Sequence, residues 1–532
     1  MDHDAAVQAI VDGRTALGIE LGSTRIKACL VSADDPSRVL GVGSHEWENR
    51  FEDGTWTYSL EAVWSGVQSA YADLVAHVVE HYDVAPSTFG AIGVSAMMHG
   101  YLAFDAADEL QVPFRTWRNT TTGQASEVLS ELFAVNIPLR WSVAHLYQAV
   151  LDEEPHITDV HFLTTLAGYV HWRLTGRKVL GIGDASGMFP IDAGTHDFDG
   201  PLLDKFDRLV AERAPGLWIS ELLPEVLVAG QAAGELTAEG AALLDPSGAL
   251  TAGIPFCPPE GDAGTGMVAT CSVAPRTGNI SAGTSIFAMV VLERPLAHTH
   301  HELDLVTTPA GDPVAMVHCN NGASELAAWV GLFARFATVS GRDLGNDDVF
   351  EVLFREALDG EPDAGGLLAY NHLAGEPIVG LDEGRPLFVR APDSRFTLAN
   401  VMRAQLYGVF GTLALGMRVL DGEDVTLETM FAHGGMFRTV GVAQRFLAGA
   451  LDVPVAVAET ASEGGAWGIA VLAAYLFEAG HIDLDGYLRE RAFQDADVVV
   501  VEPDAEDVRG FAAYLTRYQS GLAVERTAIQ AL

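Results

Sequence analysis

An acidic residue, Asp262, lies among small residues in the segment Glu260-Gly261-Asp262-Ala263-Gly264-Thr265-Gly266. Glycine and alanine neighbours let a substrate approach the carboxylate closely. Phosphoryl transfer to an alcohol needs a carboxylate that accepts the hydroxyl proton, and Mg²⁺ held by one or two carboxylates and the nucleotide phosphates. We therefore predict Asp262 as the catalytic base, and Asp262 with Glu20 as the metal-binding acids. A solvated turn carboxylate is the alternative for each.

Two glycine-hydroxyl turns repeat one pattern in distant parts of the chain. Between apolar strands, Thr15 to Ser32 contains Gly22-Ser23-Thr24, and Thr277 to Leu292 contains Gly283-Thr284-Ser285. Such a hairpin turn can offer backbone N–H groups and hydroxyls to a phosphate. One such turn is common in loops, but the repetition indicates a duplicated domain that binds one nucleotide. The P-loop signature GxxxxGK[ST] is absent.

Two further segments suit a sugar. Phe89 to Gly100 is predicted as a buried strand ending in Met97-Met98-His99-Gly100, and Phe114 to Thr120 contains Trp117 and Asn119. Ligands of open α/β sheets gather beyond the carboxyl ends of strands. An aromatic face, donors and acceptors can bind sugar hydroxyls. We predict Met98, His99, Trp117 and Asn119 as substrate-binding; a structural histidine and a core tryptophan are the alternatives.

Paired glycines mark a candidate purine site. Gly434 and Gly435 follow the strand-like Met430 to His433, and Glu463 to Gly468 opens an alanine-rich helix. Glycines at both places permit close packing of a base and ribose against the backbone. Structural packing would explain either cluster alone.

Alternating strand-like and helix-like segments predict an α/β fold. We expect an N-terminal domain at 14–275, a C-terminal domain at 276–485, and a segment at 486–532 that packs on the body. A strand is expected at Ile254 to Cys257, and a long loop at Pro362 to Pro386.

Composition limits the partners. The 532 residues are 49% hydrophobic and carry a formal net charge of −41, which argues against nucleic acid and anionic membranes. The N-terminal MDHDAAVQAI lacks a signal peptide's features, so we expect a cytoplasmic protein.

The four cysteines have no zinc-site spacing. His298, His300 and His301 lie in loop-like sequence without a nearby cysteine, which favours ordinary loop histidines over a metal site.

In order along the chain, the segments GIELGSTRIKACL, MMHG, FRTWRN, EGDAGTG, SAGTSIF, HGGMFR and EGGAWGIAVLAA resemble the FGGY family of carbohydrate kinases, over about Ala16 to Tyr475. That resemblance implies two duplicated actin-like (ribonuclease H-like) domains with an ATP cleft between them, and ATP and Mg²⁺ as cofactors. It implies Asp262 as the base, a sugar contact at Met98 and His99, and Asn119 in a sugar-site segment. It also implies the two turns as phosphate hairpins, Gly434 and Gly435 beside adenosine, and Asp184 in GIGDASG as an acid near the sugar.

Two departures from the family pattern refine the expectation. Glu20 stands where the family usually has Asp, and Met97 replaces the Gln common before MHG in xylulokinases. We expect transfer of the γ-phosphate to a ketopentose, with L-ribulose favoured over D-xylulose or D-ribulose. The alternatives are an actin- or chaperone-like ATPase and a catalytically silent sugar sensor. A small-molecule sugar is the expected partner, and the sequence is compatible with a homodimer.

Overall fold

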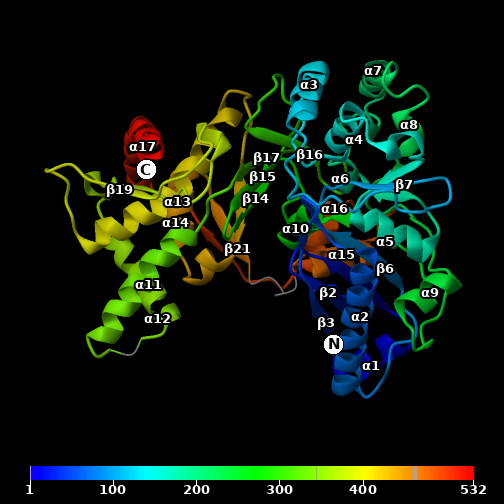
Figure 1. Ribbon diagram of the computed structural model, residues 1–532. Helices are drawn as coiled ribbons and strands as arrows, with labels where there is room; N and C mark the ends of the chain where they lie inside the picture. Colours follow the sequence, from blue (N-terminus) through cyan, green and yellow to red (C-terminus); the bar gives the residue numbers. More distant parts are fainter. Residues whose placement is uncertain (1, 343, 459–463) are drawn as a thin grey trace. The chain divides into compact units, whose positions relative to one another are not determined.

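The computed structural model describes residues 2–342, 344–458 and 464–532, and its chain forms two compact α/β units (Figure 1). Unit 1 comprises Met1–Ala274, Leu305–Val314 and Thr460–Ala496. Unit 2 comprises Pro275–Asp304, Ala315–Glu459 and Asp497–Leu532. The predicted two-domain α/β class is confirmed.

A five-stranded sheet forms the centre of unit 1, in the order β13-β6-β1-β2-β3. Its strands are β1 (Thr15–Leu21), β2 (Arg25–Ser32), β3 (Val39–Glu46), β6 (Ala91–Ala96) and β13 (Glu260–Gly261). The β1–β2 pair is antiparallel, as the first turn predicts, whereas β1–β6 and β13–β6 are parallel. Every residue of β6 is buried, so its near-continuous apolar sequence is that of a strand covered on both faces. The parallel order places the carboxyl ends of β1, β6 and β13 at one edge of the sheet.

Helices and short strands surround this sheet. The helices of unit 1 are α1 (His3–Val11), α2 (Leu60–Tyr82), α3 (Gly123–Phe133), α4 (Ser142–Leu151), α5 (Leu166–Thr175), α6 (Ile182–Ala185), α7 (Gly200–Val210), α8 (Ile219–Leu222), α9 (Ala238–Leu244), α10 (Asp262–Ala269), α15 (Gly465–Tyr475) and α16 (Leu484–Tyr487), with the 3₁₀ turn η1 (Pro155–Thr158) and the π-helical turn η6 (Leu488–Ala492). The short strands are β4 (Arg50–Glu52), β5 (Thr55–Thr57), β7 (Leu102–Phe104), β8 (Phe162–Thr164), β9 (Val179–Gly181), β10 (Ile191–Asp192), β11 (Asp197–Phe198) and β12 (Glu225–Leu227).

Unit 2 repeats the plan with strands in the order β17-β15-β14-β20-β21-β22. These are β14 (Thr277–Ala282), β15 (Ile286–Val291), β17 (Pro313–Cys319), β20 (Thr429–His433), β21 (Val455–Ala458) and β22 (Val498–Val501). The β14–β15 pair is antiparallel and β14–β20 is parallel, which matches β1–β2 and β1–β6 of unit 1. The second predicted hairpin and the internal duplication are therefore present.

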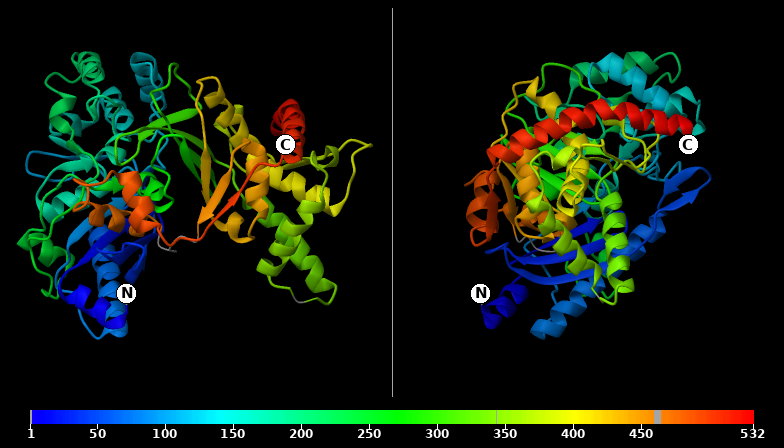
Figure 2. Two further views of the ribbon diagram at one scale, coloured as in Figure 1. Left: turned by 180° about the vertical axis from the view of Figure 1, so that it is seen from behind. Right: turned by 90° about the vertical axis from the view of Figure 1, so that its left-hand side faces the viewer.

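The remaining elements of unit 2 are largely helical. They are α11 (Ser324–Val339), α12 (Asn346–Glu356), α13 (Leu398–Asp421), α14 (Val442–Leu451) and α17 (Ala505–Ala531), the short strands β18 (Leu368–Tyr370) and β19 (Leu387–Val389), and the 3₁₀ turns η2 (Ala357–Asp359), η3 (Ala364–Gly366), η4 (Pro377–Val379) and η5 (Gly435–Arg438). Strand β16 (Leu303–Thr307) spans a boundary between the units. The long helix α17, red in Figure 2, packs against α13 and α14.

Helix α15 belongs to unit 1, although the sequence suggested a C-terminal domain that continued to residue 485. It packs against β1 and β6, and Figure 1 shows it in orange beside the blue strands. Two glycines allow this contact: a Cβ on Gly18 would lie 2.1 Å from Ala466 O, and one on Gly93 would lie 2.7 Å from the Ile469 side chain. The unit boundaries therefore follow packing between distant segments.

Two local expectations differ from the structure. Residues 254–257 form isolated bridges, at Pro255 and Phe256, and no strand. The strand that joins the sheet, β13, begins three residues after Cys257, at Glu260. The expected loop from Pro362 to Pro386 contains η3, β18 and η4. Within the described residues, none of the helices combines the length and apolar character needed to cross a bilayer.

Candidate active site

Asp262 begins helix α10 directly after β13, at the carboxyl edge of the unit 1 sheet. The backbone N–H of Met98, just beyond β6, donates a hydrogen bond of 3.0 Å to Asp262 Oδ1. The N-terminus of a helix favours a negative charge. Desolvation nevertheless raises the pKa of Asp262, while the N–H groups of Met98 and Ala263 and the charge of Arg140 oppose that rise. Asp262 is exposed, so its carboxylate is accessible to a substrate.

Two buried acids lie next to this position. The backbone N–H groups of Gly183 and Asp184 donate to the carboxylate of Glu260, at 3.3 and 3.0 Å. Thr165 donates from its hydroxyl to Asp184 Oδ2 at 2.5 Å. Burial, reinforced by Asp184, raises the pKa of Glu260 to about 8. Burial also raises the pKa of Asp184 to about 7, and the charge of Asp262 adds to this rise. Burial therefore favours the protonated form of both acids, next to the exposed carboxylate of Asp262.

The segment GIGDASG contacts MMHG through its last glycine. A Cβ on Gly187 would lie 2.6 Å from His99 Nδ1 and 2.8 Å from Met98 Cε, so both side chains reach space that only glycine leaves open. His99 itself has a φ of +71°, which is unusual for a residue with a side chain. Backbone strain of this kind concentrates at functional sites. Met97, in contrast, belongs to the apolar core of unit 1.

Glu20 lies near the end of β1, and its carboxylate approaches α15 and α10. A Cβ on Gly465 would lie 2.2 Å from Glu20 Oε1 and 3.0 Å from Thr265 Oγ1. Thr265 is one turn along the helix from Asp262, and its hydroxyl lies 3.3 Å from Asp262 O. Gly465 therefore makes the room in which the Glu20 carboxylate approaches the first turn of α10. Carboxylate oxygens at such a sheet edge have the hard-donor chemistry that Mg²⁺ prefers.

Two aromatic residues, Trp47 and Tyr58, form hydrogen bonds with the first turn, Gly22-Ser23-Thr24. Trp47 Nε1 donates to Gly22 O at 2.7 Å, and the Tyr58 hydroxyl donates to Ser23 O at 2.6 Å. The rings of Trp47 and Tyr58 stack with their centroids 4.1 Å apart. Both carbonyls of the turn are thus fixed by side chains outside it. Sequence reasoning missed these residues because they lie on other elements.

Trp117 and Asn119 have different surroundings. Trp117 is 38% exposed, and its Nε1 lies 3.3 Å from Ser23 Oγ, so the predicted sugar side chain adjoins the predicted phosphate turn. Asn119 is buried, and its side-chain amide fixes the β4–β5 hairpin. Its Oδ1 accepts a hydrogen bond from the Trp56 N–H at 2.9 Å, and its Nδ2 donates one to Trp56 O at 2.8 Å. The same amide donates to Thr116 O at 3.0 Å. Asn119 therefore positions the segment that carries Trp117.

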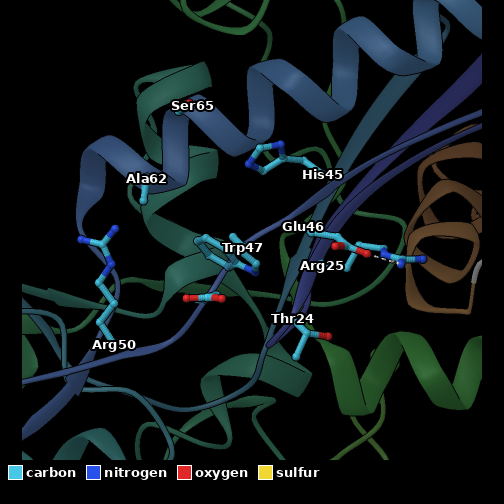
Figure 3. A pocket seen from close by; sticks show the side chains of 9 residues that line it. Thr24, Arg25, His45, Glu46, Trp47, Arg50, Ala62 and Ser65 are labelled. Atoms are coloured by element: carbon cyan, nitrogen blue, oxygen red, sulfur yellow. Dashed lines mark hydrogen bonds and ion pairs between the residues drawn. The ribbon is translucent and has the colours of Figure 1, made fainter.

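A hollow of about 740 Å³ lies on unit 1 beside the first turn (Figure 3). At one side of it, Arg25 on β2 forms an ion pair of 2.8 Å with Glu46, its neighbour on β3. Thr24 contributes to both the hollow and the predicted phosphate turn, whereas Asp262, Met98 and His99 do not line it. The residues that line it are Thr24, Arg25, His45, Glu46, Trp47, Glu48, Arg50, Ala62 and Ser65.

In unit 2 the predicted nucleotide residues gather around the second turn. Thr284 and Gly283 are exposed, and their carbonyls accept hydrogen bonds from Gly322 and Ala323, at 2.7 and 2.8 Å. Gly434 has a φ of +112°, and a Cβ there would lie 2.4 Å from the carbonyl oxygen at the end of β14. Gly435 faces open space. The start of the motif EGGAWG, through residue 463, lies outside the described residues.

Two family models match the chain. The N-terminal domain of the FGGY family of carbohydrate kinases matches residues 15–269, and the C-terminal domain matches residues 278–477. A search of curated proteins finds no match to this chain.

Similar solved structures include a xylulose kinase from Rhodospirillum rubrum, with 19% identity, coverage of 96% of this chain and 99% of that one, and a TM-score of 0.76. A gluconate kinase from Lactobacillus acidophilus has 17% identity, coverage of 96% and 98%, and a TM-score of 0.77. A glycerol kinase from Plasmodium falciparum with ADP has 13% identity, coverage of 96% and 98%, and a TM-score of 0.74. These likenesses show the actin-like fold, and the two domain matches cover most of the sequence. The chain therefore belongs to the FGGY family of carbohydrate kinases.

Proposed function

We propose that the protein transfers the γ-phosphate of ATP to a terminal hydroxyl of a ketopentose, with L-ribulose preferred over D-xylulose or D-ribulose. The observation that carries the proposal is the position of Asp262. It is an exposed carboxylate at the start of a helix and at the edge of a parallel sheet, hydrogen-bonded to the backbone of the MMHG segment. The two neighbouring acids, Asp184 and Glu260, are buried, so Asp262 is the one that a substrate can reach.

Asp262 acts as the general base in this scheme. Its carboxylate accepts the proton of the sugar hydroxyl as that oxygen attacks the γ-phosphorus, and the bond to the bridging oxygen of ADP breaks. The Met98 N–H holds the Asp262 carboxylate in place, so that one oxygen remains directed to the substrate. We assign the sugar to the side of Met98, His99 and Trp117, of which Trp117 is exposed while Met98 and His99 are buried. Asn119 contributes by fixing the Trp117 segment.

The nucleotide side uses the two turns. Ser23 and Thr24 in unit 1, and Thr284 and Ser285 in unit 2, offer hydroxyls and N–H groups to phosphate oxygens. Gly434 and Gly435 leave room beside the second turn for adenosine. Mg²⁺, bound with ATP, would neutralise phosphate charge, and Glu20 and Asp262 would supply carboxylates to hold it.

Two features bear on the identity of the sugar: the similar solved structures and the segments that differ from xylulokinases. Xylulose kinases among the similar structures support a ketopentose acceptor. Met97 lies in the core and offers no contact to a sugar, so its difference from the Gln of xylulokinases is not evidence for L-ribulose. The preference for L-ribulose rests on the FRTWRN segment.

A coupled ADP-release assay tests the proposal. Mg-ATP is supplied with L-ribulose, D-ribulose, D- or L-xylulose, L-fuculose, glycerol or gluconate, and mass spectrometry identifies the phosphorylated product. We expect the highest kcat/KM for L-ribulose. A clear preference for glycerol or gluconate would contradict a ketopentose as the phosphate acceptor.

The same assay separates the other classes. ATP turnover that does not depend on any sugar would indicate an actin- or chaperone-like ATPase. Sugar binding by calorimetry, with no phosphosugar formed, would indicate a sensor.

A further inference from the structure

A cluster of metal-ligating side chains lies in unit 2, outside the elements that the kinase reaction uses. His298 Nδ1 lies 2.9 Å from Glu423 Oε1, and His300 Nε2 lies 2.7 Å from the same oxygen. The three ligand atoms all lie within 4.8 Å of one another. In the sequence, Glu423 is 125 residues from His298 and 123 residues from His300. The fold brings Glu423 to them from beyond the end of α13.

Glu423 is held in a fixed orientation. Its side chain is 3% exposed, and its two oxygens accept backbone hydrogen bonds from Ala297 at 2.7 Å and His298 at 3.1 Å. The carboxylate is therefore oriented by the same loop that carries the imidazoles. His300 is 23% exposed and His298 is 75% exposed, so solvent and ions have access from the His298 side.

We propose that His298, His300 and Glu423 bind a transition-metal dication of the Zn²⁺ class. Two imidazole nitrogens and one carboxylate oxygen suit Zn²⁺, Co²⁺ or Ni²⁺, whereas Mg²⁺ prefers oxygen ligands throughout. The site is therefore chemically distinct from the Mg²⁺ site of the kinase reaction. Three protein ligands leave one tetrahedral position for water.

A bound metal would join two parts of unit 2. His298 and His300 lie in the connection between β15 and β16, and Glu423 lies just beyond the last turn of α13. Because the connection and the helix end are distant in sequence, a metal that binds only the folded arrangement stabilises it by mass action. We therefore expect a structural role, independent of phosphoryl transfer.

The competing explanation is a purely hydrogen-bonded cluster, in which both imidazoles donate protons to Glu423. Isosteric variants separate the two. Asn in place of His298 presents an amide N–H near the position of Nδ1, and Gln in place of His300 presents one near Nε2. The double variant His298→Asn/His300→Gln keeps donors for Glu423 but loses both imidazole ligands. His301→Gln is the matched control, because His301 is exposed and is not part of the cluster.

The experiment uses the full, untagged chain with Co²⁺ and Zn²⁺. For the wild type and His301→Gln we expect a visible Co²⁺ absorption band typical of tetrahedral coordination, and a Zn²⁺-dependent rise in Tm of about 4 °C. The double variant should lose both signals. The chain has 17 histidines, so only the difference between variants counts as evidence.

The remaining outcomes also decide the question. The absence of both signals in the wild type, or their persistence in the double variant, would overturn the proposal. If the double variant does not fold by circular dichroism, His300→Gln alone serves, and metal binding equal to that of the wild type would then overturn the proposal.

Discussion

Glu260 Oε2 accepts a hydrogen bond of 3.0 Å from the backbone N–H of Asp184, so two buried acids lie side by side next to the predicted base, Asp262. The arrangement separates the roles of three carboxyl groups. Asp184 and Glu260 are inaccessible and have raised pKa values, whereas Asp262 is exposed. Protonation of either buried acid reduces the build-up of like charge beside Asp262.

The pH dependence of stability tests this arrangement. A buried acid whose folded pKa is raised binds its proton more tightly in the folded state, so its contribution to stability is present at low pH and is lost as pH rises. For Glu260 the loss extends from about pH 4.5 to about pH 8. Glu260→Gln keeps one acceptor oxygen, for the N–H of either Gly183 or Asp184, and has no charge to bury. We expect this variant to gain stability relative to the wild type as pH rises from 5 to 8.

Urea denaturation of both proteins at pH 5 and pH 8 measures the effect. The stability of the whole acidic chain changes with pH, so the measured quantity is the difference in unfolding free energy between variant and wild type at each pH. A stability difference between variant and wild type that does not change with pH would contradict the raised pKa of Glu260.

The role of Asp262 is tested by Asp262→Asn. The amide keeps the shape and can still accept the Met98 hydrogen bond, but it cannot take a proton from the sugar. We expect kcat to fall by about 10²–10⁴-fold with little change in sugar affinity. ADP release gives kcat, and calorimetry gives sugar binding. Near-normal turnover would remove Asp262 from the role of base.

The paired glycines of unit 2 offer a matched comparison. Gly434→Ala introduces a Cβ at a φ of +112° and 2.4 Å from Ala282 O, whereas Gly435→Ala introduces one into open space. We expect the first variant to lose about 1–3 kcal/mol of stability and to bind ATP weakly. The second should keep its stability, as measured by thermal unfolding. A higher KM for ATP in Gly435→Ala, with stability unchanged, would support adenosine at this position. Equal stability of both variants would contradict the steric argument.

The first turn is tested through the residue that holds it. Tyr58→Phe removes the hydroxyl that donates to Ser23 O at 2.6 Å and leaves the stacked ring in place. A loosened turn orders phosphate less well, so we expect KM for ATP to rise by about 3–10-fold, equivalent to about one hydrogen bond. The sugar KM at saturating ATP should not change. A selective rise in the sugar KM would assign Tyr58 to the acceptor side.

Local pattern was enough to predict some parts of the fold and not others. The two hairpins were predictable because each is made of adjacent strands and a short turn. Helix α15 was predicted as a helix, but its packing on the unit 1 sheet was not, because that packing depends on Gly18 and Gly93, far away in the sequence. The strand expected at residues 254–257 was wrong, since that segment makes only isolated bridges.

The candidate site shows the same division. Asp262 could be found from its small neighbours, and Asp184 from the resemblance to related kinases. The contact between Glu260 and Asp184 could not be predicted from the sequence, because it forms where helix α6, which begins at Ile182, meets β13. Asn119 has the residue type of a sugar ligand, but the structure commits its amide to the backbone of Trp56. Residue type gives the chemistry available, and only the fold shows where each group is directed.

The assembly of unit 1 from three separate segments has a consequence for biosynthesis. A ribosome that has released Met1–Ala274 has supplied the whole central sheet, yet the face at Gly18 and Gly93 lacks the helix that covers it. That helix emerges only after most of unit 2. Domains usually fold in the order in which they are synthesised, but unit 1 cannot be completed before most of unit 2 has been synthesised. Its nascent form has to persist with an apolar sheet face exposed, which is where we expect chaperones to bind and truncated chains to aggregate.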